Sequence, residues 1–176
     1  MADRWMSHAP RLLVWLGIVC LAGLGAVLVA QHVFDVRPCP WCVLQRGIVL
    51  LLGLLALTGG ALAWALKHRG HLYRAHLTAR LAAIPVLLLA LSGLVAATYQ
   101  HEVASQSESC AMTAADRLLT ALDLEAKWPA VFMVTASCQD AAHYRLLGLP
   151  YEIWSGLLFA LALGAGLVAL LSGARV

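Results

Sequence analysis

The sequence of 176 residues predicts an all-α integral membrane protein, built as a four-helix bundle. Hydrophobic residues make up 62% of the chain and charged residues only 12%, whereas about 25% of residues are charged in a typical soluble domain. The chain also contains four long apolar stretches without Asp, Glu, Lys or Arg. A soluble fold of this composition would lack the polar side chains needed to cover its surface. We therefore expect a single membrane domain over residues 1–176.

Each apolar stretch is long enough to cross a bilayer. A spanning helix needs about 20 apolar residues, because a rise of about 1.5 Å per residue has to cross about 30 Å of hydrocarbon. The expected spans are 12–30, 47–66, 81–99 and 153–173. In the fourth span, Gly156, Ala160 and Gly164 recur at every fourth position. Small residues at this spacing let helices approach closely in lipid, so we expect a packing seam there.

The basic residues predict the orientation of the spans. Loops that face the cytoplasm carry an excess of Lys and Arg, and the loop 67–80 holds Lys67, Arg69, Arg74 and Arg80. We therefore expect this loop and both termini in the cytoplasm, with 31–46 and 100–152 as outer loops. The basic residues of the chain are otherwise dispersed, without a run that could follow a phosphate backbone, which argues against nucleic-acid binding.

The long outer loop is expected to carry one short amphipathic helix. Its polar tract 105–109 predicts a mobile segment. Thr113 and Asp116 then resemble a capping box, and three leucines share a helical face: Leu118, Leu119 and Leu122. Such a helix could lie in the headgroup plane or pack on protein. Pro129 is expected to end it.

The five cysteines fall into two classes. Cys20 lies in the middle of the first span, where a lone cysteine behaves as a small hydrophobic side chain. The other four are all in the outer loops, and four cysteines allow three pairings. Adjacency in the sequence favours Cys39 with Cys42, which leaves Cys110 with Cys138.

The C-x-x-C motif of Cys39 and Cys42 favours redox chemistry over three other uses. As a structural disulfide it would close almost no chain and gain little loop entropy. A zinc site would need two more ligands at suitable spacing, and Cys110 and Cys138 are too far apart in the sequence for a finger, so we expect no metal. Covalent haem requires a histidine where Val43 stands.

The position of the motif supports a reactive thiolate. Cys42 directly precedes the expected second span, so its sulfur should lie near free N–H groups and the positive end of the helix dipole. Arg46 follows one turn later, on the same helical face. Its guanidinium could stabilise the Cys42 thiolate and an oxygen-rich electron acceptor, or it could simply snorkel to the interface.

At this point the sequence resembles the disulfide bond formation protein B (DsbB) family over nearly its whole length. The C-x-x-C motif with an arginine four positions after its second cysteine, at a helix mouth, is the most specific feature. The other supporting segments are 31–33 (Gln-His-Val), 98–101 (Thr-Tyr-Gln-His), 131–138 (Val-Phe-Met-Val-Thr-Ala-Ser-Cys) and 147–149 (Leu-Gly-Leu).

The resemblance implies an electron relay in the bacterial inner membrane. A reduced DsbA-like protein of the thioredoxin fold would attack the Cys110–Cys138 disulfide through Cys110. Cys138 would then exchange with Cys39, and Cys42 would pass the electrons to a membrane quinone, ubiquinone or menaquinone, beside Arg46. This DsbA–DsbB–quinone system is already known to keep the periplasm oxidising. The resemblance also places His101 near the quinone, although an interfacial histidine hydrated by water fits equally well.

Two features of the sequence, one residue and one dipeptide, are departures from the best-known family member. Gln45 stands where that member has a glutamate, so a carboxylate there is not essential in this chain, and Pro40 and Trp41 form the dipeptide inside the motif.

Three alternatives to this function remain. A reductase of the vitamin K epoxide type would carry its C-x-x-C on the last span, which here has no cysteine. A family paralogue dedicated to one substrate, and a non-catalytic scaffold with structural disulfides, are the other two.

Overall fold

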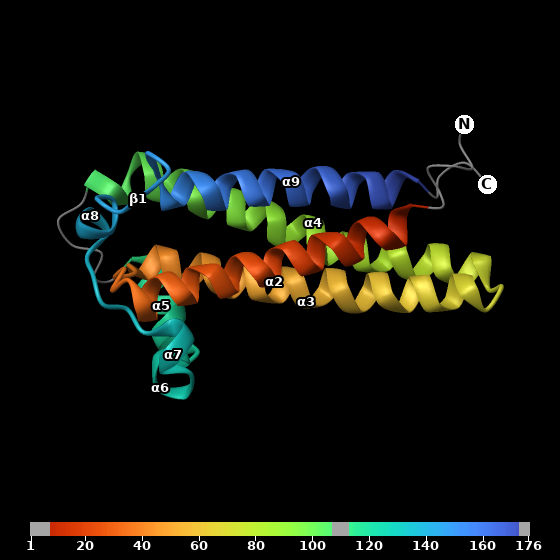
Figure 1. The fold of residues 1–176 in the computed structure, drawn as a ribbon, viewed down its shortest axis with the longest axis horizontal. Helices are drawn as coiled ribbons and strands as arrows, with labels where there is room; N and C mark the ends of the chain where they lie inside the picture. Colours follow the sequence, from red (N-terminus) through yellow and green to blue (C-terminus); the bar gives the residue numbers. More distant parts are fainter. Residues whose placement is uncertain (1–7, 107–112, 173–176) are drawn as a thin grey trace. The chain divides into compact units, whose positions relative to one another are not determined.

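The computed structural model describes residues 8–106 and 113–172. Four long helices dominate it (Figure 1): α2 (Ala9–Val33), α3 (Pro40–His68), α4 (Leu72–Glu102) and α9 (Tyr151–Leu171). Each of them is long and apolar enough to cross a membrane. The predicted all-α, four-helix membrane fold is confirmed.

The helices extend beyond the apolar stretches from which they were predicted. Helix α3 begins at Pro40 rather than at residue 47, and α4 begins at Leu72 rather than at 81. Proline suits the first helical position, because its φ is already helical and its missing N–H is not needed there. At the other end of α3, Gly70 adopts a φ of 80° and its N–H bonds to the carbonyl of Lys67 over 3.1 Å. This helix-ending turn shortens the loop predicted at 67–80 to residues 69–71.

The residues form two compact units, and the first comprises 1–23, 49–91 and 159–176. Its core consists largely of alanines, with Leu13 fully buried among them. A Cβ atom added at Gly17 would lie only 2.7 Å from the Cβ of Leu57, so glycine is what allows these helices to approach so closely. Cys20 is 1% exposed and is not disulfide-bonded. It is a buried small side chain, as predicted.

The packing seam predicted on α9 is wrong at two of its three positions, whereas a Cβ added at Gly156 would lie 3.7 Å from the Cβ of Ala97 in α4. Ala160 and Gly164 are exposed, and a Cβ at Gly164 would meet nothing within 4 Å. The buried face of this part of α9 is one position away and carries Phe159, Ala162, Gly166 and Ala169. A regular spacing of small residues did not locate this face, because the face also includes the large ring of Phe159.

The second unit comprises Leu24–Ile48 and Ser92–Leu158. Between α4 and α9 its described residues form five short helices: η1 (Ala104–Gln106), α5 (Ala114–Ala121), α6 (Leu124–Lys127), α7 (Pro129–Phe132) and α8 (Cys138–Ala141). Strand β1 (Arg145–Leu146) then pairs antiparallel with β2 (Leu149–Pro150). The turn residues Leu147 and Gly148 both have positive φ, 53° and 84°, as a tight two-residue hairpin requires.

The amphipathic helix predicted in the long loop is present as α5 but is shorter than expected. The side chain of Thr113 accepts a hydrogen bond from the N–H of Asp116, so the predicted N-cap is confirmed. Only one of the three leucines on the predicted face, Leu119, is buried, so α5 packs on protein through that side chain. The polar tract predicted to be mobile begins as η1, and its remaining residues lie outside the described part of the chain.

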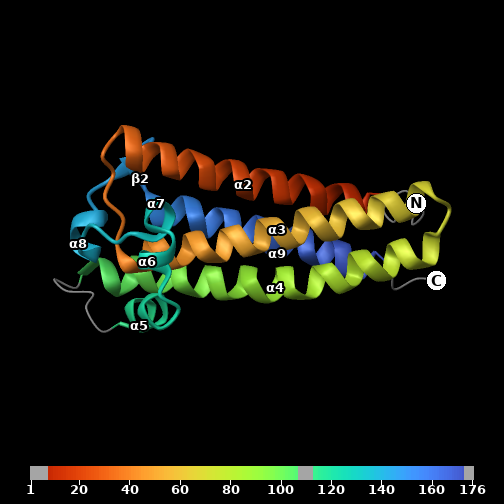
Figure 2. The ribbon, with the colours of Figure 1, turned by 90° about the horizontal axis from the view of Figure 1, so that it is seen from below.

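Pro129 does not end this helix as predicted. Helix α5 stops at Ala121, and Asp123 takes a left-handed conformation with a φ of 54° before α6 starts. Pro129 instead occupies the first position of α7, where its fixed φ is favourable. Figure 2 shows α5, α6 and α7 following one another near the beginning of α3. A Cβ added at Gly47 of α3 would lie 3.3 Å from the ring of Phe132 in α7.

Candidate functional site

The two cysteines of the C-x-x-C motif lie at the very start of α3. Cys39 is fully buried and precedes the helix, and Cys42 lies in its first turn. Their sulfur atoms are 2.9 Å apart and the two thiols are not joined by a disulfide. The sulfur of Cys39 accepts a hydrogen bond from the N–H of Cys42 over 3.3 Å, and its carbonyl accepts from Val43. Cys39 therefore acts as the N-cap of α3.

This arrangement favours the protonated thiol at Cys39 and makes Cys42 the sulfur that accepts hydrogen bonds. The hydrogen bond to Cys42, and secondly burial, raise the pKa of the Cys39 thiol far above its ordinary value. The Cys39 S–H can therefore remain protonated and donate to the sulfur of Cys42. The helix N–H expected beside the Cys42 sulfur is used by Cys39 instead, so Cys42 must obtain stabilisation for a thiolate from other groups.

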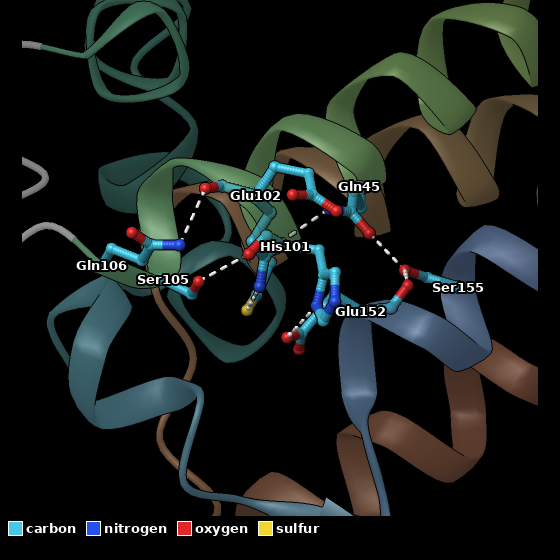
Figure 3. Close-up of polar contacts among 9 residues, drawn as sticks. Gln45, His101, Glu102, Ser105, Gln106, Glu152 and Ser155 are labelled. Atoms are coloured by element: carbon cyan, nitrogen blue, oxygen red, sulfur yellow. Dashed lines mark hydrogen bonds and ion pairs between the residues drawn. The ribbon is translucent and has the colours of Figure 1, made fainter.

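A series of hydrogen-bonded side chains, two of them buried, supplies that stabilisation. The side-chain amide of Gln100, near the end of α4, donates to the sulfur of Cys42 over 3.2 Å. The amide of Gln45 in turn donates to the oxygen of Gln100 over 2.7 Å, and the hydroxyl of Ser155 in α9 donates to the oxygen of Gln45. Figure 3 shows Gln45 and Ser155 joined in this way. Gln45 and Gln100 are only 4% and 3% exposed.

Sequence reasoning did not find Gln100 or Ser155 as site residues. Gln100 belongs to the segment 98–101, whose distinguishing feature is its resemblance to the family, and Ser155 is a single hydroxyl within a spanning stretch. The available signal was an amide directly at the end of an apolar span, where an unpaired polar group is costly.

Arg46 is buried within the protein. Its Nη1 donates to the side-chain oxygen of Gln31 in α2 and to the carbonyl of Val131, the latter over 3.4 Å. Its Nε is buried and has no hydrogen-bond partner among the described residues. With 7% of its surface exposed, Arg46 does not snorkel to the interface, and its positive charge acts on both cysteines of the motif. The placement matches the predicted position of a cation beside Cys42.

Trp41 lies inside the motif and is also buried. Its ring packs against that of Tyr99, with centroids 4.7 Å apart. Its indole N–H, like the Nε of Arg46, has no partner among residues 8–106 and 113–172. The first two turns of α3 therefore carry two buried N–H groups that donate to no described residue.

Cys138 belongs to the same buried cluster as Cys39. That cluster also contains Trp41, Ala96, Ala104, Ala115 and Ala141. Cys138 is 1% exposed and disulfide-bonded, whereas Cys110, its predicted partner, lies outside the described residues. Backbone hydrogen bonds hold the segment in place, because the N–H groups of Thr135 and Ala136 both donate to the carbonyl of Pro38, over 3.0 and 3.2 Å. Cys138 and Cys39 are thus brought together by Pro38, which precedes Cys39, and by Thr135 and Ala136, which lie three and two positions before Cys138.

His101 is directed towards α9. Its Nδ1 lies 3.3 Å from a carboxylate oxygen of Glu152, as Figure 3 shows, and the His101 side chain is 45% exposed whereas that of Glu152 is 3% exposed. The Nδ1 of His101, the histidine that the family resemblance places near a quinone, therefore has the carboxylate of Glu152 as its partner. Within the described residues, no three His, Cys, Asp or Glu side chains gather closely enough to hold a metal ion.

A cavity of about 470 Å³ lies beside the residues that hold Arg46. Gln31, which accepts the hydrogen bond from Arg46, forms part of its wall. Its other lining residues come from the end of α2, the following loop, α7 and the segment after it: His32, Asp35, Val36, Arg37, Pro129, Ala130, Met133 and Thr135. The wall therefore offers both apolar surface and several polar groups.

Comparison with known proteins identifies the family. Residues 9–169 match the family described as disulfide bond formation protein DsbB. Disulfide bond formation protein B 1 of Pseudomonas entomophila is 32% identical over 157 residues, which cover 89% of this chain and 86% of that protein. The same coverage holds for Disulfide bond formation protein B 1 of Pseudomonas fluorescens Pf-5, at 33% identity, and for Disulfide bond formation protein B of Burkholderia thailandensis, at 30%.

No solved structure matches the chain. The family match covers most of the sequence, and the described residues place a C-x-x-C motif at the mouth of a spanning helix. The chain therefore belongs to the disulfide bond formation protein DsbB family and is a multi-pass membrane disulfide oxidoreductase.

Proposed function

We propose that this oxidoreductase reoxidises a periplasmic, DsbA-like thiol oxidase of the thioredoxin fold and passes the electrons to a membrane quinone. The protein would lie in the bacterial inner membrane as a single membrane domain, with both termini in the cytoplasm and the active cysteines in the periplasm. The observation that carries the proposal is the common buried cluster of Cys39 and Cys138, because electrons can pass between two cysteine pairs only where one sulfur from each can meet.

The relay consists of thiol–disulfide exchanges, each of which conserves electrons. A thiolate of the reduced partner attacks Cys110 of the Cys110–Cys138 disulfide, forming a mixed disulfide and releasing Cys138 as a thiolate. The second partner thiol then displaces Cys110, so the partner leaves oxidised and Cys110 and Cys138 are both reduced. Cys138 next attacks Cys39 of an oxidised Cys39–Cys42 pair, and Cys42 leaves as a thiolate. Cys110 finally attacks Cys138, which restores the first disulfide and leaves Cys39 and Cys42 reduced.

The surroundings of Cys42 favour its role as leaving group and electron donor. Its sulfur accepts a hydrogen bond from Gln100, lies 2.9 Å from the sulfur of Cys39, and experiences the positive charge of Arg46. Each of these interactions stabilises a negative sulfur. A thiolate that is stabilised leaves faster in an exchange reaction.

The residues around Cys42 fit a quinone. The Nε of Arg46 and the indole N–H of Trp41 are buried donors without partners among the described residues, and quinone carbonyl oxygens are acceptors. Gln31 connects Arg46 to the wall of the 470 Å³ cavity. When bound, a quinone would supply an acceptor for the two electrons and two protons that the Cys39–Cys42 dithiol loses on oxidation. DsbA is strongly oxidising, with a potential of about −120 mV, so its reoxidation requires an acceptor of this kind.

The proposal is tested by turnover of the purified protein. We expect the protein, given a reduced thioredoxin-fold dithiol partner and a soluble quinone, to reduce the quinone, as followed by its absorbance. Cys42→Ser should abolish turnover, whereas Cys20→Ser, which alters the buried cysteine of the other unit, should retain it. Absence of quinone reduction by the intact protein would refute the proposal and favour a scaffold with structural disulfides.

A further inference from the structure

A chain of hydrogen bonds leads from Ser155 through Gln45 and Gln100 to Cys42, and each residue donates to the next. The same side chains can also form these hydrogen bonds with the donors and acceptors exchanged. A thiolate can only accept hydrogen bonds, so the amide of Gln100 must point its N–H₂ towards Cys42. The oxygen of Gln100 then faces Gln45 and requires its N–H₂, and the oxygen of Gln45 requires the hydroxyl of Ser155. One negative sulfur thus determines the orientation of three side chains on three helices.

The opposite direction is available when Cys42 is a thiol, although an S–H is a weaker donor than an amide. The S–H of Cys42 can donate to the oxygen of Gln100, whose N–H₂ then faces the oxygen of Gln45. The N–H₂ of Gln45 then faces the Ser155 oxygen. Ser155 still has an acceptor for its proton, because its Oγ lies 2.9 Å from the carbonyl oxygen of Glu152. Each nitrogen, oxygen and sulfur atom in this series of hydrogen bonds has at least one partner in both arrangements, so neither arrangement leaves one of these polar atoms unpaired.

From these contacts we propose that Ser155, Gln45 and Gln100 form a reversible hydrogen-bond chain, which stabilises the Cys42 thiolate in one direction and the thiol in the other. Gln45 and Ser155 are positioning residues, because they act on the sulfur only through Gln100, which touches it. The two amides rotate by half a turn about their terminal torsions, and no proton travels along the chain. The inference rests on the proposed role of Cys42 as the reacting thiolate.

Five ionisable groups of the described residues bear on this series of hydrogen bonds. Cys39 and Arg46 act directly on the sulfur of Cys42. Cys138 shares the buried cluster but is disulfide-bonded. At the far end, Glu152 provides the backbone carbonyl for Ser155, and its carboxylate faces His101. A test must therefore change the chain without altering any of these groups.

Ser155→Ala provides such a change, because it removes only the donor at the far end of the chain. The experiment uses the full chain in detergent, in a Cys39→Ser background, and measures alkylation of Cys42 by iodoacetamide across a pH series with peptide mass analysis. We expect Ser155→Ala to lower the alkylation rate at neutral pH by about two- to tenfold, the range for loss of one hydrogen bond. Ser155→Thr should restore the rate.

Two further variants give the scale. Ser105→Ala is the matched control, because the hydroxyl of Ser105 donates only to the backbone carbonyl of His101, and it should leave the rate unchanged. Gln100→Glu replaces the donor with an acceptor of nearly the same shape and should lower the rate most. If Ser155→Ala equals Ser105→Ala while Gln100→Glu is slow, the stabilisation ends at Gln100 and the proposed chain is wrong.

A second measurement decides the matter even if Ser155→Ala does not fold. In the Cys39→Ser protein labelled with ¹⁵N-glutamine, the side-chain amide signals of Gln45 should shift at the same pH as the thiolate absorbance of Cys42. A Gln45 signal that does not change with pH would overturn the inference. Neither measurement uses a quinone or a protein partner, so a failure of the proposed function would be recognised separately.

Discussion

Arg46 of α3 and Gln31 of α2 are joined side chain to side chain, and this contact connects the guanidinium beside the reactive cysteines to the wall of a cavity. The contact fixes the position of one nitrogen of Arg46 while another, Nε, has no partner among the described residues. Because Nη1 is held by Gln31, the guanidinium has a defined orientation, and its Nε–H can donate a charge-assisted hydrogen bond to an incoming acceptor.

Arg46→Ala is therefore expected to impair quinone use more than folding. Loss of a charge-assisted hydrogen bond costs about 1.5–3 kcal/mol, which corresponds to roughly a tenfold or greater rise in the KM for a soluble quinone. The KM is measured by quinone absorbance at saturating dithiol. Arg74→Ala is the control, because Arg74 of α4 is exposed, belongs to the first unit and is not among the residues that line the cavity. An unchanged KM in Arg46→Ala would remove this residue from the quinone site.

Cys110→Ser should separate the two halves of the relay. The protein partner can no longer form a mixed disulfide, so its oxidation should stop. A small dithiol that reaches the Cys39–Cys42 pair should still support quinone reduction, because that pair is intact. Partner oxidation is followed by alkylation and gel shift, and quinone reduction by absorbance. Continued oxidation of the partner by Cys110→Ser would show that another cysteine receives the electrons.

Thr135→Pro should slow the transfer between the two cysteine pairs. Proline removes the N–H that donates to the carbonyl of Pro38 over 3.0 Å, and reacting groups displaced by about 1 Å can lose about 10²-fold in rate. We expect turnover to fall by about tenfold or more, with accumulation of reduced Cys110 and Cys138 on rapid quenching. Thr135→Ala keeps the N–H and should be nearly normal. Equal rates for the two variants would show that this backbone contact is not needed.

Leu119 and Leu118 offer a matched test of how α5 packs. Leu119 is 2% exposed and Leu118 is 46% exposed, although both belong to the face predicted from the sequence. Leu119→Ala should destabilise the protein by about 2–4 kcal/mol, and Leu118→Ala by about 0.5 kcal/mol or less. Thermal unfolding in detergent measures the difference. Similar losses for both variants would indicate that the whole leucine face, rather than Leu119 alone, is buried.

The sequence was sufficient to predict the features that depend on local composition and spacing. Charge-free stretches of sufficient length predicted the four spanning helices, and the spacing of Cys42 and Arg46 placed both side chains at one end of α3. The ends of the helices were predicted less well, because polar residues such as Arg74 and His76 continue the helix beyond its apolar part.

The features that depend on contacts between distant segments could not be predicted in this way. The chain from Ser155 to Cys42 depends on the relative registers of α3, α4 and α9, which no single segment specifies. Likewise, the proximity of Cys138 to Cys39 depends on two backbone hydrogen bonds to Pro38, and backbone donors leave no signature in side-chain identity. The break between α5 and α6 depends on the left-handed backbone of Asp123, which aspartate tolerates without requiring it.

The capping role of Cys39 has a consequence for the motion of the protein during turnover. Its sulfur both accepts the N–H that starts α3 and would exchange with Cys138. Whenever that sulfur turns away to form a bond elsewhere, the N–H of Cys42 loses its acceptor, and the helix start is weakened by the cost of a lost cap, about 1 kcal/mol. The first turn of α3 should therefore loosen and tighten once in every catalytic cycle. The backbone conformation of this turn would then depend on whether the Cys39 sulfur is bonded to another cysteine.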